Sequence, residues 1–365
     1  MPNAKSPLIV LAAGGTGGHV FPAEALAREL LGRGFRVVLV TDRRGGTFSA
    51  ELSVPVHRVR ARPLGKGFFG KIRSLADMGL GVLQAARLLR KQKPAVVVGF
   101  GGYPSLPTVY AAARAGIPIV LHEQNAILGR ANKVMADKAR LVATAFPHVV
   151  GLKNARVLRT GNPVRAAFAA LRATPYASLG DNDPVRLLVL GGSLGAHVLS
   201  HVVPRALALM PASLRRRFII AQQCRAEDLE SARAAFAGAG IDAELSPFFR
   251  DVPERMANAH IVISRSGGST IAELTAIGRP AILVPFPHGH AGEQTANAEA
   301  IAEAGGAWII PEQAFTPEAL AVRLEALLTL PVNLAKAAAA ARAWGTVSAA
   351  DALADGVVEA LKSGR

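Results

Sequence analysis

Two segments far apart in the sequence share one pattern, a short apolar run that ends in clustered glycines. The first is Leu8–His19 and the second is Leu187–His197. An apolar run of this length that stops at glycines predicts a buried parallel strand entering a tight loop. The free N–H groups of such a loop, and of the helix after it, can bind an anion. We therefore expect two domains of the nucleotide-binding type.

The similarity between the two halves continues beyond these loops. Residues 95–102 resemble residues 260–268, and residues 116–122 resemble residues 278–284. Three matches in the same order indicate an internal repeat, and the spacing between them varies as loop lengths can. The chain is thus expected to contain two related units.

Length and the order of elements agree with this expectation. The 365 residues suit two domains of roughly 150 to 190 residues. Apolar runs alternate with helical stretches, which predicts α/β domains with parallel sheets. We expect the first domain at residues 1–163, the second at 164–340, and a C-terminal segment, 341–365, that packs back toward the first.

The expected elements follow from the apolar runs and from the glycines and prolines that end them. In the first half, strands are expected at 36–40, 95–98, 117–121, 141–143 and 157–159, with helices at 23–31 and 71–92. In the second half, strands are expected at 186–190, 218–221, 261–263 and 281–284, with helices at 196–209, 226–238, 269–277, 317–328 and 333–361.

Cysteine content and hydropathy disfavour several classes of protein. Cys224 is the one cysteine, which excludes a disulfide framework and a cysteine-built zinc site and favours a reducing, cytoplasmic compartment. The apolar run at 8–13 is too short for a secretory signal. Prolines and glycines interrupt the uncharged stretch at 94–113, so we do not expect it to span a membrane.

The net charge of +16 predicts an anionic partner. Such a surface attracts nucleic acid, an anionic lipid surface or a phosphorylated substrate. Aromatic residues make up only 5% of the chain and no base-stacking motif accompanies the charge. The lipid surface and the phosphorylated substrate therefore fit at least as well as nucleic acid.

The loop Gly14–His19 is the first candidate site. Its four glycines remove every β-carbon that would keep a diphosphate away from the backbone N–H groups. A tight turn capped by His19 is the structural alternative. A dinucleotide site with Asp42 as the ribose-binding acid is the functional alternative, although the loop lacks the last glycine of that fingerprint.

Two loops of the second half are further candidates. Ser193, in the loop Gly191–Gly195, has a hydroxyl that can donate to phosphate. In the segment Ser264–Glu273 a strand ends in small residues and a helix begins, so the Glu273 carboxylate could accept two hydrogen bonds from a ribose diol. A plain turn and a surface glutamate near a helix start are the respective alternatives.

Polar side chains also follow the strand at 117–121. The segment His122–Asn125 is expected at the carboxyl edge of the sheet, where open α/β sheets bind ligands. His288 and His290 suggest a metal, but no third ligand lies nearby in the sequence, so we expect ordinary loop residues.

The segment Arg62–Arg73 mixes cations with large apolar residues. This composition suits insertion at an anionic membrane surface, with rings at the interface and cations on the headgroups. A basic loop whose phenylalanines fill the core is the alternative. The residues expected to contact the membrane are Lys66, Phe68, Phe69, Lys71 and Arg73.

Together these motifs resemble one family, the peptidoglycan N-acetylglucosaminyltransferases that convert lipid I to lipid II. The motifs that carry the resemblance are Gly14–Ala23, Gly101–Ser105, His122–Asn125, Gly161–Arg165, Gly191–Ser193, Arg265–Gly267 and Gln294–Asn297. The resemblance implies the GT-B fold, in which two Rossmann-like parallel-sheet domains face an interdomain cleft. It also implies a peripheral enzyme of cell-wall biogenesis and cell division, on the cytoplasmic face of the bacterial inner membrane.

The resemblance further implies an inverting hexosyltransferase that needs no metal and no cofactor. It moves N-acetylglucosamine from UDP-N-acetylglucosamine to the C4 hydroxyl of the N-acetylmuramoyl sugar of lipid I. The implied partners are these two substrates, an anionic membrane surface and cell-wall synthesis proteins, without nucleic acid. An NAD-dependent oxidoreductase and a basic nucleic-acid-binding α/β protein remain the alternatives.

Site residues are implied position by position. The donor diphosphate is assigned to Ser193, the uracil to the backbone at Phe249, the ribose and phosphates to Gly268, Ser269, Thr270, Ile271 and Glu273, and the sugar hydroxyls to Gln294 and Asn297. Thr16, Gly17, Gly18, Asn125 and Arg165 are expected to complete the donor site. His19, Tyr103 and Glu123 are expected to face the acceptor.

The transfer reaction needs groups that stabilise the leaving diphosphate and a base that deprotonates the acceptor hydroxyl. Departure of UDP leaves about two negative charges, which oriented N–H groups, a helix N-terminus and Arg165 can stabilise. The acceptor hydroxyl must lose a proton to a base, for which His19 has a suitable intrinsic pKa range. Glu123 is the rival base, and the sequence does not decide between them.

Overall fold

The computed structural model of the chain describes residues 6–15, 17–43, 52, 54–63, 65, 67–153, 155–192 and 195–362, without the side chain of His290. Three residues with an expected binding role, Thr16, Lys66 and Ser193, lie outside these ranges. The chain divides into two units, one formed by Met1–Arg165 with Ser348–Arg365 and the other by Ala166–Val347.

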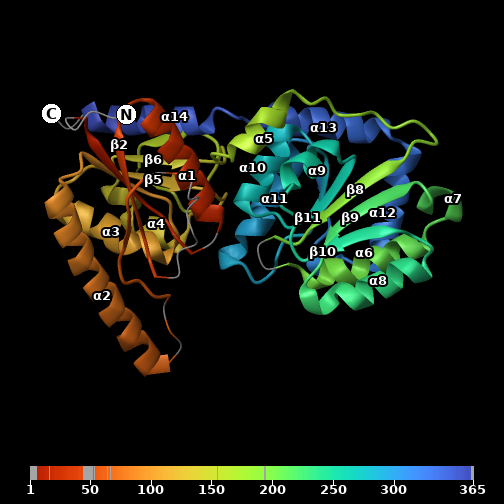
Figure 1. Ribbon diagram of the computed structural model, residues 1–365, viewed down its shortest axis with the longest axis horizontal. Coiled ribbons are helices and arrows are strands. Elements are labelled where there is room, and N and C mark those ends of the chain that lie inside the picture. Colours follow the sequence, from red (N-terminus) through yellow and green to blue (C-terminus); the bar gives the residue numbers. More distant parts are fainter. Residues whose placement is uncertain are drawn as a thin grey trace. The chain divides into compact units, whose positions relative to one another are not determined.

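The first unit is built on a parallel sheet (Figure 1). This sheet has seven strands in the order β3-β2-β1-β4-β5-β6-β7. Its strands are β1 Leu8–Ala12, β2 Arg36–Thr41, β3 Val56–Arg58, β4 Val96–Gly99, β5 Ile119–Glu123, β6 Leu141–Thr144 and β7 Val157–Arg159. Its helices are α1 Gly17–Gly32, α2 Gly67–Gln92, α3 Gly102–Arg114, α4 Arg130–Met135, η1 Ala136–Lys138 and α14 Ala349–Lys362.

Helices bury both faces of this sheet, as its continuous apolar strands require. One core joins alternate residues of β1 to Leu26 of α1 and Leu353 of α14. The other core joins the remaining residues of β1 to Leu89 of α2 and Val109 of α3. The final helix of the chain is therefore part of the first unit.

The second unit has a six-stranded parallel sheet with the order β10-β9-β8-β11-β12-β13. Its strands are β8 Val185–Leu190, β9 Phe218–Gln223, β10 Ala243–Ser246, β11 Ile261–Ser264, β12 Ala281–Leu283 and β13 Ala307–Ile309. Its helices are α5 Ala166–Ala170, η2 Leu171–Ala173, α6 His197–Leu209, α7 Ala212–Arg215, η3 Ala226–Asp228, α8 Leu229–Gly238, α9 Val252–Asn258, α10 Gly268–Ile277, η4 His290–Gly292, α11 Glu293–Glu303, η5 Glu312–Ala314, α12 Pro317–Thr329 and α13 Val332–Trp344.

The strand orders confirm the internal repeat and the two Rossmann-like parallel-sheet domains. The three segments matched by sequence are β1 with β8, β4 with β11, and β5 with β12, and they hold the same positions in the two sheets. In each sheet the strand order reverses between the first strand of the repeat and the strand that follows it in the sheet, β1 and β4 or β8 and β11. Open α/β sheets bind ligands at the carboxyl ends of strands at such a switch point.

Some elements differ from the expectation. The edge strands β3, β10 and β13 have only three or four residues, too few for a clear apolar pattern, and they were not expected. The expected helix at 333–361 is two helices, α13 and α14. They separate at Gly345, where a Cβ would lie 2.4 Å from the backbone of Thr275, so only glycine permits this close approach.

No single helix among the described residues is both long and apolar enough to cross a bilayer. One bent pair in the C-terminal region, Pro317–Thr329 with Val332–Lys362, would be long and apolar enough when taken together, by length and composition only.

Candidate active site

In the first unit, glycines allow the loop after β1 to pack against the start of α3. A Cβ at Gly14 would lie 2.8 Å from Cβ of Pro104, and one at Gly102 would lie 3.1 Å from Cδ2 of His19. Gly15 and Gly102 also have φ values of 93° and 69°, which glycine adopts at little cost. The glycines thus bring His19 against the carboxyl edge of β4.

A chain of hydrogen bonds runs from the His19 ring into the unit. His19 Nδ1 lies 3.2 Å from Oε1 of Gln124. Nε2 of Gln124 lies 3.0 Å from Nδ1 of His122 and donates to the carbonyl of Phe100 at 2.9 Å. His122 Nε2 lies 3.1 Å from the carbonyl oxygen of Gly161.

The two carbonyl groups decide where the protons lie. A carbonyl oxygen only accepts, so Phe100 requires the amide nitrogen of Gln124 on its side, and Gly161 requires the proton of His122 on Nε2. Nδ1 of His122 then accepts from Gln124, whose Oε1 faces His19. Neutral His19 consequently carries its proton on Nδ1 and leaves Nε2 able to accept one.

Burial keeps both rings neutral. The pKa of His122 is lowered to about 4, mainly by burial and to a smaller extent by the nearby His19, while the hydrogen bond to Gly161 opposes the shift. Burial also lowers the pKa of His19, against the charge of Glu123 and hydrogen bonds to Gln124 and Phe100. Near neutral pH, His19 is therefore a neutral imidazole whose proton is held on Nδ1.

Glu123 has a different environment from His19. Its carboxylate is buried at the end of β5 and accepts from four groups on the loop and on helix α4 that follow. The donors are the backbone N–H of Asn125 at 3.1 Å, Nδ2 of Asn125 at 3.4 Å, the N–H of Gly129 at 2.9 Å and Nδ2 of Asn132 at 2.8 Å. These bonds occupy both oxygens and hold the loop that carries Asn125.

The other expected residues of this unit have defined neighbours. The hydroxyl of Tyr103 donates to Oδ2 of Asp42 at 3.1 Å, and Asp42 is buried. A buried carboxylate bound to a tyrosine is not presented to a ribose, which disfavours the dinucleotide interpretation. The Arg165 guanidinium stacks on the ring of Phe21, 4.8 Å from its centre, beside α1.

In the second unit, Gln223 connects two of the expected donor loops. Its Oε1 accepts from the N–H of Gly191 at 3.2 Å, and its Nε2 donates to the carbonyl of Gly192 at 3.3 Å. The same Nε2 donates to the carbonyl of Pro247 at 3.2 Å. One side chain at the end of β9 thus holds the glycine loop after β8 next to the loop after β10.

Phe249 lies in this second loop, and its side chain is part of the protein interior. The ring is buried beneath the Arg255 guanidinium, which lies 4.2 Å from its centre. Arg255 in turn pairs with Glu244 and Asp251. The ring anchors the loop and leaves its backbone as the part that can meet a ligand.

The loop between β11 and α10 offers hydrogen-bond donors that a ligand could use. Gly267 has an extended conformation, and α10 begins at Gly268, so the first N–H groups of this helix face the carboxyl edge of the sheet. Among the described residues the hydroxyl of Ser269 has no hydrogen-bond partner although it is buried. A buried hydroxyl without a partner is costly unless a ligand supplies one.

Gln294 and Asn297, expected to hold sugar hydroxyls, bind this loop in the structure. Oε1 of Gln294 accepts from the N–H of Ser266 at 3.3 Å and of Phe286 at 3.0 Å. Nδ2 of buried Asn297 donates to the carbonyl of Ser266 at 3.0 Å. Both side chains therefore brace the segment before α10, and Glu273 lies partly buried on the second turn of that helix.

Helix α2 carries an exposed apolar surface with cations beside it. Phe68 and Phe69 are 73% and 84% exposed, which excludes the alternative that their rings fill the core. The helix begins at Gly67, one turn before the expected start, so both rings belong to it. The other large exposed apolar residues of α2 are Ile72, Leu75, Leu80 and Leu83.

A groove lined by apolar and basic residues lies at the other end of α2. It has a volume of about 770 Å³, and its lining includes Arg87, Arg90 and Lys93. Lys71 and Arg73 are exposed near the phenylalanines. The helix thus combines exposed rings at its start with cations along its length, an arrangement suited to an anionic lipid surface.

Sequence reasoning missed Gln223. It gave no individual role to Gln124 and Ser266, although both lie in segments that it expected to form sites. Each follows or ends a buried strand at the carboxyl edge of a sheet, and that position was the available signal. Their hydrogen-bond partners come from distant segments, so the sequence alone did not show their roles.

Two Rossmann-like units with glycine loops at their switch points are the architecture of the GT-B class of glycosyltransferases. The family models for the glycosyltransferase family 28 N-terminal and C-terminal domains match residues 9–144 and 186–354. The chain belongs to glycosyltransferase family 28.

Named relatives cover nearly the whole chain. A protein of Rhodospirillum centenum is 59% identical over 360 residues, which is 98% of this chain and 95% of the relative. One of Paramagnetospirillum magneticum is 52% identical over 361 residues, covering 98% and 97%. Both are named UDP-N-acetylglucosamine–N-acetylmuramyl-(pentapeptide) pyrophosphoryl-undecaprenol N-acetylglucosamine transferase. The crystal structure of Acinetobacter baumannii MurG superposes with a TM-score of 0.79 at 28% identity, covering 97% of this chain and 99% of that one.

The buried His122 ring predicts a pH dependence of stability. Its pKa is about 4 in the folded protein and 6.5 in the unfolded chain, so the unfolded state binds more protons between these values. The free energy of unfolding should therefore fall as the pH decreases from 6.5 to 4, by about 3 kcal/mol from this group. Urea unfolding of the full chain across this range measures the slope.

His122→Asn should flatten this slope, while His148→Asn, at an exposed position of the same unit, should leave it unchanged. An equal slope in His122→Asn and the parent protein would show that His122 does not remain neutral in the fold.

Proposed function

We propose that this chain is the transferase that makes lipid II: it moves N-acetylglucosamine from UDP-N-acetylglucosamine to the C4 hydroxyl of the N-acetylmuramoyl sugar of lipid I. The observation that carries this conclusion is the 59% identity, over nearly the whole chain, to a relative of that name. The finer statements, namely the residues, inversion at the sugar carbon, independence from metals and the membrane surface, are our proposals.

The second unit is proposed to bind the donor. The N–H groups at the start of α10, with the hydroxyl of Ser269, suit the phosphates and ribose, because they are free donors at a switch point. Glu273 is proposed to accept from the ribose diol. The backbone beside Phe249 is proposed to meet the uracil, since Gln223 holds that loop against the loop at Gly191.

Gln294 and Asn297 are proposed to act on the donor sugar mainly by holding the loop before α10 in place. Their amides are engaged with the segment at Ser266, so a sugar contact would have to be made in addition to these bonds. Ser193 is retained as a diphosphate ligand by the family resemblance.

The first unit is proposed to bind the acceptor and to supply the base. His19 Nε2 is unprotonated in the tautomer that Gln124 imposes, so it can take the proton of the acceptor hydroxyl as the bond to the sugar carbon forms. Glu123, whose two oxygens already accept four hydrogen bonds, is proposed to position Asn125 and its loop. Tyr103 is proposed to contact the acceptor.

The leaving UDP is proposed to be stabilised without a metal. The diphosphate gains about two negative charges, and preorganised N–H groups and a guanidinium can stabilise them electrostatically. Arg165 is the proposed guanidinium, and its stacking on Phe21 limits the positions of its head group. The glycines of the first loop, Gly17 and Gly18, are proposed to complete the donor site.

The membrane contact is proposed to lie on α2. Its exposed rings can enter the interfacial region, and its cations can bind anionic headgroups, in keeping with a net charge of +16. A peripheral position on the cytoplasmic face of the inner membrane would bring the enzyme to its lipid-linked acceptor. Cell-wall synthesis proteins are proposed as further partners.

Turnover should be measurable as UDP release from UDP-N-acetylglucosamine with a lipid I analogue, in the presence of a chelator. We expect release that depends on the analogue and persists without free metal. Stabilisation of the protein by NAD or by an oligonucleotide, but not by UDP-N-acetylglucosamine, would contradict the function.

His19→Ala should lower kcat by about a hundredfold or more, because it removes the proposed base, while the affinity for UDP-N-acetylglucosamine stays nearly unchanged. Glu123→Gln is the comparison. It should reduce the rate through a displaced loop but keep the acidic limb of the pH profile, since His19 remains. A His19→Ala rate above about a tenth of the parent rate would exclude His19 as the base.

The double variant Phe68→Ser, Phe69→Ser should bind anionic liposomes more weakly, because two rings no longer enter the interface. Co-sedimentation with liposomes measures the bound fraction. Phe248→Ser is the matched control, since this phenylalanine is also exposed but belongs to the second unit. Unchanged binding of the double variant would contradict the proposed membrane surface.

A further inference from the structure

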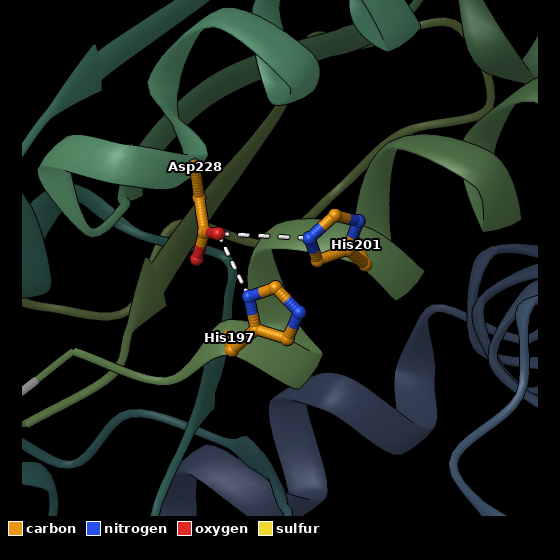
Figure 2. Close-up of side chains that lie close together, drawn as sticks. All are labelled: His197, His201 and Asp228. Carbon is orange, nitrogen blue, oxygen red and sulfur yellow. Dashed lines mark hydrogen bonds and ion pairs between the residues drawn. The ribbon is translucent and has the colours of Figure 1, made fainter.

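Two histidines and an aspartate of the second unit converge at the start of α6 (Figure 2). His197 and His201 are four residues apart, so their rings lie on the same face of the helix, with centres 4.1 Å apart. Asp228 ends η3 and points at both rings. Within the described part of the chain, this is the group of three side chains whose ligand atoms, one from each, all lie within 4.8 Å of one another.

The carboxylate of Asp228 satisfies only one of the two rings. Its Oδ1 lies 2.7 Å from Nδ1 of His197, a hydrogen-bond distance, but 3.6 Å from Nε2 of His201. Nε2 of His201 and Oδ2 of Asp228 are both buried and have no hydrogen-bond partner among the described residues. Asp228 as a residue is only 2% exposed.

These two atoms without partners indicate a position suited to a cation. A buried polar atom without a partner costs free energy, and a buried carboxylate costs more unless a positive charge accompanies it. One cation between the rings and the carboxylate would satisfy His201 Nε2 and neutralise Asp228 together.

We propose that His197, His201 and Asp228 bind a divalent transition metal ion, with Zn²⁺ as the expected metal. The ligand atoms would be Nδ1 of His197, Nε2 of His201 and a carboxylate oxygen of Asp228. Two imidazoles and a carboxylate with an open fourth position suit Zn²⁺, whereas Mg²⁺ and Ca²⁺ prefer oxygen ligands.

The distances fit such a site. Ligand atoms about 2.1 Å from a tetrahedral zinc ion lie about 3.4 Å from one another. The two measured separations, 2.7 and 3.6 Å, fall on either side of this value. His197 would carry its proton on Nε2 instead of Nδ1 when the metal is bound, and binding would weaken at low pH because the ligands must be unprotonated.

The position of the site indicates a structural role. A metal there would tie the start of α6 to η3 and the start of α8. Helix α6 directly follows the glycine loop after β8, and η3 begins beside that loop, since a Cβ at Gly195 would lie 2.8 Å from Cγ of Arg225. The site differs from the pair His288 and His290 considered in the sequence, and it supplies no group to the proposed transfer reaction.

Titration of the chelator-treated full-length protein with Zn²⁺, in competition with a chromogenic chelator, tests the proposal. We expect one equivalent to bind and the melting temperature to rise on binding. His201→Gln and Asp228→Asn should each weaken the affinity about tenfold or more and abolish the rise. Co²⁺ should give visible absorption bands that these variants lose.

Two further variants keep the test decisive. His197→Gln changes a side chain that is 61% exposed, so it should fold normally and still weaken Zn²⁺ binding. His148→Gln, an exposed histidine of the first unit, should bind Zn²⁺ like the parent protein. Absence of stoichiometric binding, or equal affinities in the parent, His197→Gln and His201→Gln, would overturn the proposal and leave an ion-paired cluster.

Discussion

The burial of each parallel sheet on both faces is the constraint on which the other features depend. Strands such as β1 and β8 are apolar nearly throughout, so helices must cover both faces and polar groups are confined to the strand ends. At the carboxyl edge the polar groups meet glycine loops and helix N-termini. Groups that can bind a ligand are therefore concentrated at one edge of each sheet, at the point where the strand order reverses.

The two units place a histidine after the glycine loop in two different environments. His19 follows the glycine loop of the first unit, and His197 follows that of the second. His19 meets Gln124, which follows β5, whereas His197 meets the Asp228 carboxylate, which follows β9. The neutral amide of Gln124 fixes the tautomer of His19 and leaves its Nε2 able to accept a proton. The carboxylate of Asp228 instead accepts a hydrogen bond from His197 and can bind a cation together with it. The partner side chain, rather than the repeated sequence, sets the chemistry.

Several site residues were foreseen as members of a site but not in their detailed roles. The polar segment after β5 was identified from the sequence. Only the structure shows that the Glu123 carboxylate accepts hydrogen bonds from the segment that follows it, and that Gln124 orients His19. Gln294 and Asn297 were expected to contact sugar, and they brace the loop at Ser266. Polar residues at a sheet edge can bind a ligand or each other, and local sequence does not distinguish these outcomes.

Local sequence patterns were sufficient to predict the α/β class, the internal repeat and the family, because apolar strands, glycine loops and their order can be recognised without the tertiary structure. They also located the apolar and basic segment of α2. Tertiary structure alone decided the short edge strands, the break at Gly345, the tautomer of His19 and the grouping of His197, His201 and Asp228. Each of these depends on atoms from segments distant in the sequence, which come into contact only when the sheets form.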